Sequence, residues 1–178
     1  MSDARTIDPA RLAIQGATNA LATLQGGVTT VRCVGTAANV DLVIRDAVRA
    51  GQIPGPDIVA AGRVIAMTGG HGHHMAIEAD GVASIVQAVR EQVKSGADVI
   101  KLMVTGGVLT PGGRPGMPQL LPEELHAAIT VAHRAGRRVC GHAEGPEGVR
   151  DAVVAGIDSI EHGYFVADRR EHQAGGRL

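Results

Sequence analysis

Residues 97–107 read ADVIKLMVTGG, an apolar strand-like run with a charged side chain in its interior. That side chain is Lys101, one of only two lysines in the chain. Two similar runs follow, RVCGHAEG at 138–145 with His142 and DSIEHG at 158–163 with His162. Histidine nitrogens bind metal ions, and lysine side chains can take part in such sites. A lysine followed by two histidines in three successive strand-like runs therefore indicates metal-dependent hydrolysis.

Short β-branched runs alternate with longer amphipathic segments that end near glycine, which is typical of a β/α fold. We expect right-handed βαβ units and a parallel sheet. Segment 63–79, rich in Gly and His, is expected to be a long loop. The expected helices are 8–25, 38–50, 81–95, 122–135 and 146–155; the expected strands are 28–34, 57–61, 159–162 and the runs that hold Lys101 and His142.

The composition is that of a globular chain of one domain's size, with 178 residues, 44% apolar content and a net charge of -1. Its near-neutral charge, single Tyr and single Phe argue against nucleic acid as a partner. No run approaches the roughly 20 apolar residues of a membrane span, so we expect no membrane partner and a cytoplasmic location. Cys33 and Cys140 lie in separate apolar segments and are expected to be reduced thiols.

The three strand residues can converge, because the carboxyl ends of parallel barrel strands meet at one face. Taken singly, a strand lysine can reach solvent and a histidine can be a structural hydrogen-bonding group. Three of them in consecutive strands favour a site. A buried lysine has a lowered pKa, and its neutral amine can react with carbon dioxide to form a carbamate. Such an anionic ligand and neutral imidazoles can bind divalent ions such as zinc.

Five motifs resemble the amidohydrolase superfamily, in its imidazolonepropionase-like and prolidase-like branch: GVTTVR at 27–32, TGGHG at 68–72, GADVIK at 96–101 with TGG at 105–107, GHAEG at 141–145 and AGIDSIEHG at 155–163. The resemblance implies a TIM-type (β/α)8 barrel that hydrolyses amide or other C-N bonds of a small, amide or dipeptide-like substrate. Lys101 would be the carboxylated, bridging lysine of a site for one or two divalent ions, with zinc as the expected metal. His142 and His162 would be metal ligands.

Two parts of the family's pattern are not found in the chain. The family has a His-x-His pair at the end of its first strand and an aspartate, a ligand and proton shuttle, at the end of its eighth. The first readable strand here matches the family's second, so we expect strands 2 to 6 with their helices, in a partial barrel domain at 1–168 with a disordered tail at 169–178. No catalytic residue is therefore assigned.

An incomplete barrel leaves unpaired backbone groups at its terminal strands. We therefore expect a homo-oligomer or a complementing chain as partner. A non-catalytic fragment that associates in this way is the alternative to a hydrolase.

Three further residues are expected on the substrate side of the site: His71, Glu144 and Tyr164. Each has another interpretation. His71 belongs to the cluster HGHH at 71–74, which could bind a metal by itself as a separate module. Glu144 could be a helix N-terminal residue stabilised by the macrodipole, and Tyr164 could be a packing residue.

Overall fold

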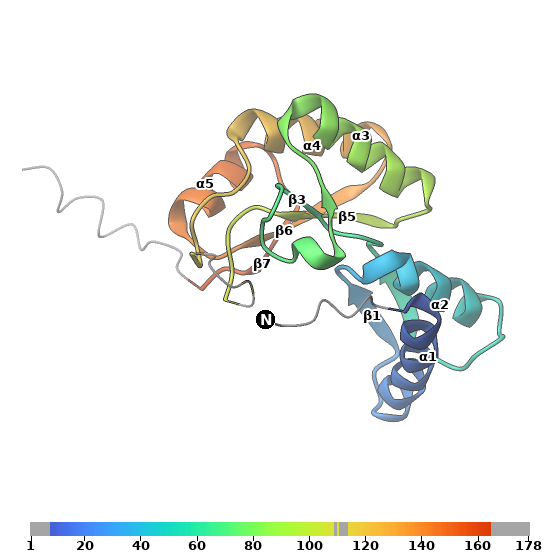
Figure 1. Ribbon diagram of the computed structural model, residues 1–178. Coiled ribbons are helices and arrows are strands. Elements are labelled where there is room, and N and C mark those ends of the chain that lie inside the picture. Colours follow the sequence, from blue (N-terminus) through green and yellow to red (C-terminus); the bar gives the residue numbers. More distant parts are fainter. Residues whose placement is uncertain (1–7, 109, 111–113, 165–178) are drawn as a thin grey trace, which may run out of the picture.

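The computed structural model describes residues 8–108, 110 and 114–164, so the expected tail at 169–178 lies outside the described residues. Five α-helices and seven short strands alternate along this part of the chain (Figure 1). They are α1 (Pro9–Gln25), β1 (Thr30–Cys33), α2 (Val40–Arg49), β2 (Asp57–Ala60), β3 (Ile65–Ala66), β4 (Ile77–Glu78), α3 (Gly81–Lys94), β5 (Val99–Met103), α4 (Pro122–Arg134), β6 (Arg138–Ala143), α5 (Pro146–Val154) and β7 (Ser159–His162).

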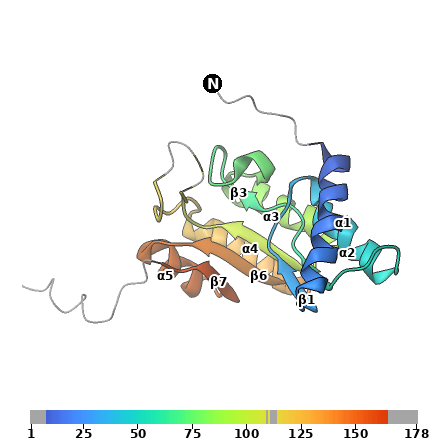
Figure 2. The ribbon, with the colours of Figure 1, turned by 90° about the horizontal axis from the view of Figure 1, so that it is seen from below.

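All of the strand ladders are parallel, as predicted. One sheet has the order β4-β3-β5-β6-β7, and β1 and β2 form a second, two-stranded sheet. In Figure 1, α3, α4 and α5 lie along one side of the larger sheet, and α1 and α2 lie beside β1. Figure 2 shows α1 and α2 together at the edge that β1 forms. The α/β class and the parallel sheet are thereby confirmed.

The core lies between the larger sheet and its helices. Ile100 and Leu102 of β5 pack there against Ile85 and Leu125 of the covering helices, and all four side chains are buried. Residues alternate between the two faces of a strand, so Lys101 points to the opposite face, which is the inside of the curved sheet. All five residues of β5 are nevertheless buried. Burial on both faces explains the nearly continuous apolar run around the lysine.

Segment 63–79 is not a plain loop, and that expectation was wrong. It contains β3, a 3-10 turn at His73–Met75, and β4, which pairs with β3 in parallel. Val64 and the residues of β3 are fully buried, and the Ile77 amide donates to the Val64 carbonyl at 2.8 Å. Strands of two residues are too short to show periodicity, but their apolar side chains gain from burial as longer strands do.

Gly62 turns the chain between β2 and β3 with a φ of 72°. The Gly62 amide donates to Asp41 at 2.8 Å, and the next amide, that of Arg63, donates to Asn39 at 2.8 Å. The sharp turn thus has its backbone donors paired by side chains from the start of α2. It connects the two sheets, because β2 pairs with β1 whereas β3 pairs with β5.

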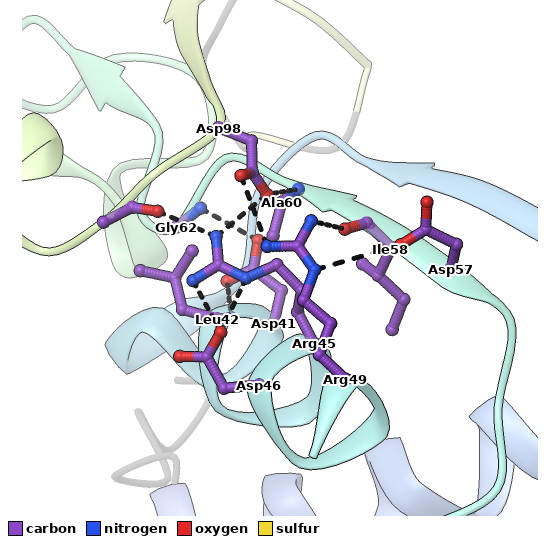
Figure 3. A network of polar contacts seen from close by, with 11 residues as sticks. Asp41, Leu42, Arg45, Asp46, Arg49, Asp57, Ile58, Ala60, Gly62 and Asp98 are labelled. Atoms are coloured by element: carbon purple, nitrogen blue, oxygen red, sulfur yellow. Dashed lines mark hydrogen bonds and ion pairs between the residues drawn. The ribbon is translucent and has the colours of Figure 1, made fainter. Parts of the chain in front are cut away.

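At two places in the sheet, an aspartate that directly precedes one strand binds the backbone of the neighbouring strand. Asp98, before β5, accepts a hydrogen bond from the Ala60 amide of β2 at 3.0 Å and binds Arg45 of α2 at 2.8 Å (Figure 3). Asp158, before β7, likewise accepts from the Val139 amide of β6 at 2.7 Å and binds His133 of α4. Both contacts lie at the amino ends of the strands, away from the site described next.

The helix predictions agree with the structure to within two residues. Asp8 caps α1 by accepting a hydrogen bond from the Ala10 amide at 3.0 Å, as expected. The second helix begins at Val40 rather than at Ala38, because Ala38 and Asn39 have positive φ values. Both cysteines are free thiols. No helix in the described part of the chain is long and apolar enough to cross a membrane.

Candidate metal and substrate site

Lys101 lies on the inner face of β5 and is only 2% exposed. In the register of the sheet it stands opposite Cys140 of β6, which in turn stands opposite Ser159 of β7. Burial lowers the pKa of the Lys101 amine, and the cation of Arg32 lowers it further, whereas Cys140 and Glu161 oppose the shift. The environment of Lys101 therefore favours the neutral amine.

His142 lies one row nearer the carboxyl ends of the strands, on the same face as Lys101. Burial is the main cause that lowers the pKa of His142 to about 4, and the neighbouring His71 is the second cause. Its Nε2 atom lies 3.3 Å from the carbonyl oxygen of Gly106. The imidazole is therefore neutral near pH 7, which is the form that binds metal ions.

His162 ends β7, and its ring centroid lies 4.9 Å from that of His142. In the ladder His162 is the partner of Ala143, so regular alternation would direct its side chain to the other face. Its φ of 75° interrupts that alternation. A positive φ is uncommon for a residue other than glycine and is often found at functional sites.

His71 comes from the segment between β3 and β4, and its ring centroid lies 4.4 Å from that of His142. Its Nδ1 atom is 3.0 Å from the Thr110 hydroxyl, and its backbone amide donates to the Gln119 side chain at 2.9 Å. Gly107 lies between the two rings. A Cβ atom on Gly107 would come within 2.6 Å of His71 and 2.8 Å of His142, so a larger residue there would require at least one ring to move.

His73 and His74 do not join this group. Their rings contact each other at a centroid distance of 5.9 Å, edge to face. Within residues 8–108, 110 and 114–164, no three His, Cys, Asp or Glu side chains are placed to hold a metal ion. Within that part of the chain, His142 and His162 are therefore not joined by a third side chain of these types.

Glu144 follows β6 and is buried, with 5% of its surface exposed. Its backbone amide donates to the Thr105 hydroxyl at 3.2 Å. The carboxylate atom Oε2 is buried and has no hydrogen-bond partner within the described residues. Tyr164, by contrast, is 74% exposed, and its ring lies parallel to that of His162 with a centroid distance of 6.1 Å.

Arg32 of β1 reaches across the inside of the curved sheet to β7. Its guanidinium binds Glu161 at 2.7 Å and Ser159 at 2.9 Å. Sequence reasoning did not single out Arg32, although the signal was the one that identified Lys101: a charged side chain within an apolar strand run. Thr105 and Gln119 were also missed, because their roles depend on how the loop after β5 folds back.

A curved parallel β/α sheet with a lysine and two histidines toward the carboxyl ends of its strands defines the class of barrel proteins whose site lies at that face. The chain belongs to the amidohydrolase family, whose model matches residues 2–176. The predicted family and the partial TIM-type barrel are thereby confirmed.

Similar proteins include an ochratoxinase, a dipeptidase and a prolidase. The ochratoxinase of Aspergillus niger is 32% identical over an alignment 164 positions long, which covers 78% of this chain and 34% of that protein. The crystal structure of a Xaa-Pro dipeptidase with bound methionine is 37% identical, with a TM-score of 0.87 over 95% of this chain and 45% of that one. A prolidase complexed with N-methylphosphonate-L-proline is 31% identical, with a TM-score of 0.86, and the match covers 92% of this chain and 44% of that one. This chain thus spans about a third to a half of the length of these relatives.

Proposed function

We propose that the chain forms the central part of a metal-dependent amidohydrolase that cleaves the C-N bond of a small amide or dipeptide-like substrate. In this proposal Lys101, as a carbamate, His142 and His162 hold one or two divalent ions, with zinc as the expected metal. His71, Glu144 and Tyr164 contact the substrate. Membership of the amidohydrolase family and the similarity to dipeptidases and ochratoxinase support this substrate class.

One observation carries the proposal: Lys101 is buried on the inner face of the sheet, and this burial lowers the pKa of its amine. Burial of a charged ammonium group away from water is strongly unfavourable. The neutral amine avoids that cost and is also the form that reacts with carbon dioxide. The product is an anionic oxygen ligand beside two imidazoles, a donor set that suits zinc.

The side chains have separate roles in this proposal. A divalent ion at these residues would polarise the substrate carbonyl and lower the pKa of a water molecule. His142 and His162 supply neutral ring nitrogens, and the loop after β5 positions His71 through Thr110 and Gln119. The resembled family uses an aspartate at the end of its eighth strand as a proton shuttle. None of these residues corresponds to that aspartate.

The carbamate can be observed directly. The chain is incubated with zinc and 13C-bicarbonate, and a carbamate carbon signal is sought by NMR. We expect the signal in the wild-type chain and in Lys94→Met, which changes the exposed lysine, but not in Lys101→Met. A wild-type chain without the signal, or a Lys101→Met variant that keeps it, would contradict the proposed role of Lys101. Hydrolysis of a panel of dipeptides and N-acyl amino acids then tests the activity itself.

A second candidate function is association with another copy of this chain or with a complementing chain. It is supported by a groove of about 460 Å³ between α1, α2 and β1. Apolar side chains line most of it, among them Leu12, Val31, Val40, Ile44 and Ile58. Within the described residues β1 pairs only with β2, so its other edge is open. Sedimentation velocity over a hundredfold concentration range tests self-association. A protein that stays monomeric at every concentration would contradict the proposal that the chain associates with itself.

A further inference from the structure

The carboxylate of Glu144 has a buried oxygen without a partner. The residue is 5% exposed, and its Oε2 atom accepts no hydrogen bond within the described residues. Buried polar groups are almost always hydrogen-bonded, because leaving one unpaired is costly. A buried carboxylate oxygen of this kind next to a candidate active site is therefore expected to have a partner that the described residues do not provide.

The helix that follows does not supply this partner. α5 begins at Pro146, whose nitrogen carries no hydrogen, and the Val149 amide donates to the Gly145 carbonyl at 3.0 Å. No amide of the first turn of α5 donates to the Glu144 carboxylate in the part of the chain that is described. Within the described residues, Glu144 therefore makes no capping hydrogen bond to α5.

The position of Glu144 directs it to the site. It lies two residues after His142, and its backbone is held by the Thr105 hydroxyl at 3.2 Å. Residues two apart in an extended segment lie on the same side, so the Glu144 side chain lies on the same side as that of His142. The ring of His142 in turn contacts that of His71.

The loop after β5 folds back and approaches the backbone next to Glu144. The Gly106 amide donates to the Met117 carbonyl at 2.9 Å, and the Gly116 amide donates back to the Gly106 carbonyl at 3.0 Å. A Cβ atom on Gly116 would lie 3.1 Å from Gly145. Glu144 itself is largely shielded from solvent, and a charge in such an environment interacts more strongly with a charged ligand than one in water.

We propose that Glu144 is a specificity residue that binds a protonated nitrogen of the substrate, so that the substrate class is an amide that carries an ammonium group close to the scissile bond. The inference rests on the proposed function for the location of the substrate. The nitrogen can belong to a free α-amino group or to a basic side chain. Both present the same charge and donors, and a charge-assisted hydrogen bond to a carboxylate is among the stronger contacts in proteins.

Three peptides separate the two sources of the charge. N-acetyl-L-norleucyl-L-proline is the uncharged reference, L-norleucyl-L-proline adds an α-ammonium group, and N-acetyl-L-lysyl-L-proline adds a side-chain ammonium group. Binding to the zinc-treated chain is measured by isothermal titration calorimetry at pH 7. We expect at least one charged peptide to bind about tenfold more tightly than the reference.

The variants assign that difference to one carboxylate. Glu144→Gln should abolish the preference for the charged peptide, whereas Glu147→Gln, which changes an exposed carboxylate in the first turn of α5, should retain it. Circular dichroism and zinc content show whether each variant keeps its fold and its metal. Equal binding of all three peptides, absence of binding, or a preference that survives in folded Glu144→Gln would overturn the inference. Zinc content that depends on Lys101 would leave the proposed function standing in each case.

Discussion

The imidazole rings of His71 and His142 lie with their centroids 4.4 Å apart, although one belongs to the segment between β3 and β4 and the other to β6. Thr110, on the loop after β5, contacts the His71 ring from a third segment. The candidate site is therefore assembled by two loops that follow different strands. This arrangement is usual for barrel enzymes, in which loops at the carboxyl ends of the strands carry the chemistry.

We predict that Gly107→Ala disturbs the site without unfolding the chain. The added methyl group would lie within 2.8 Å of both imidazole rings, so at least one of them must move. Displacing the groups that orient metal ligands typically lowers metal affinity by about 10- to 100-fold. Zinc affinity measured by competition with a chromophoric chelator checks this.

Gly26→Ala is the matched control, because a Cβ atom there meets only ordinary contacts of 3.4 Å or more. We expect its zinc affinity to equal that of the wild-type chain. Unchanged affinity in Gly107→Ala would show that the two rings do not depend on their present separation.

The stability of the metal-free chain should depend on pH through His142. Burial lowers the pKa of His142 to about 4, from a usual value of 6.5. Between these values the unfolded chain binds the proton and the folded chain does not, so the free energy of unfolding falls as the pH falls. We expect a loss of about 1–2 kcal/mol from pH 7 to pH 4 that His142→Asn removes.

Urea denaturation at a series of pH values measures this dependence. His126→Asn, which changes an exposed histidine on α4, serves as control and should keep the wild-type slope. The explanation would be wrong if the His142→Asn variant lost stability with acid as steeply as the control.

A third prediction concerns Asp98 at the amino ends of the strands. Asp98→Ala removes the acceptor for the Ala60 amide and one ionic partner of Arg45, whose side chain is buried (Figure 3). We expect the free energy of unfolding to fall by about 1–3 kcal/mol, while zinc binding by the folded protein is unaffected. Chemical denaturation and zinc titration measure the two effects separately.

Asp151→Ala is the control for this effect, because Asp151 faces the largely exposed Arg150 at 3.7 Å. Such a pair contributes at most about 1 kcal/mol. Equal losses of stability in the two variants would show that the Asp98 contacts have no special weight.

Much of the fold followed from the sequence, because long amphipathic helices and β-branched runs have distinct periods. α4 and α5 end within one residue of their predicted bounds. β3 and β4 were missed because two residues show no period. β3 is stabilised by burial and β4 by its pairing with β3, and only the tertiary structure determines both.

Part of the geometry of the candidate site was also predictable. The contact of His142 with His162 follows from the rule that parallel strands end at one face, whereas a metal site with Lys101 stays a prediction. The contact of His71 with His142 depends on the path of two loops, and the link from Arg32 to Glu161 depends on the curvature of the sheet. Neither is encoded in the spacing of residues along the chain.

The most direct test of the central claim is the zinc content of the purified chain, prepared with zinc and bicarbonate and measured by elemental mass spectrometry. Lys101→Met is compared with Lys94→Met, which changes the other lysine of the chain, at the exposed end of α3. The proposed site predicts stoichiometric zinc in the wild-type chain and in Lys94→Met, and its loss in a folded Lys101→Met variant. Zinc that is absent from the wild-type chain, or that remains after Lys101 is replaced, would contradict a metal site built on Lys101, His142 and His162.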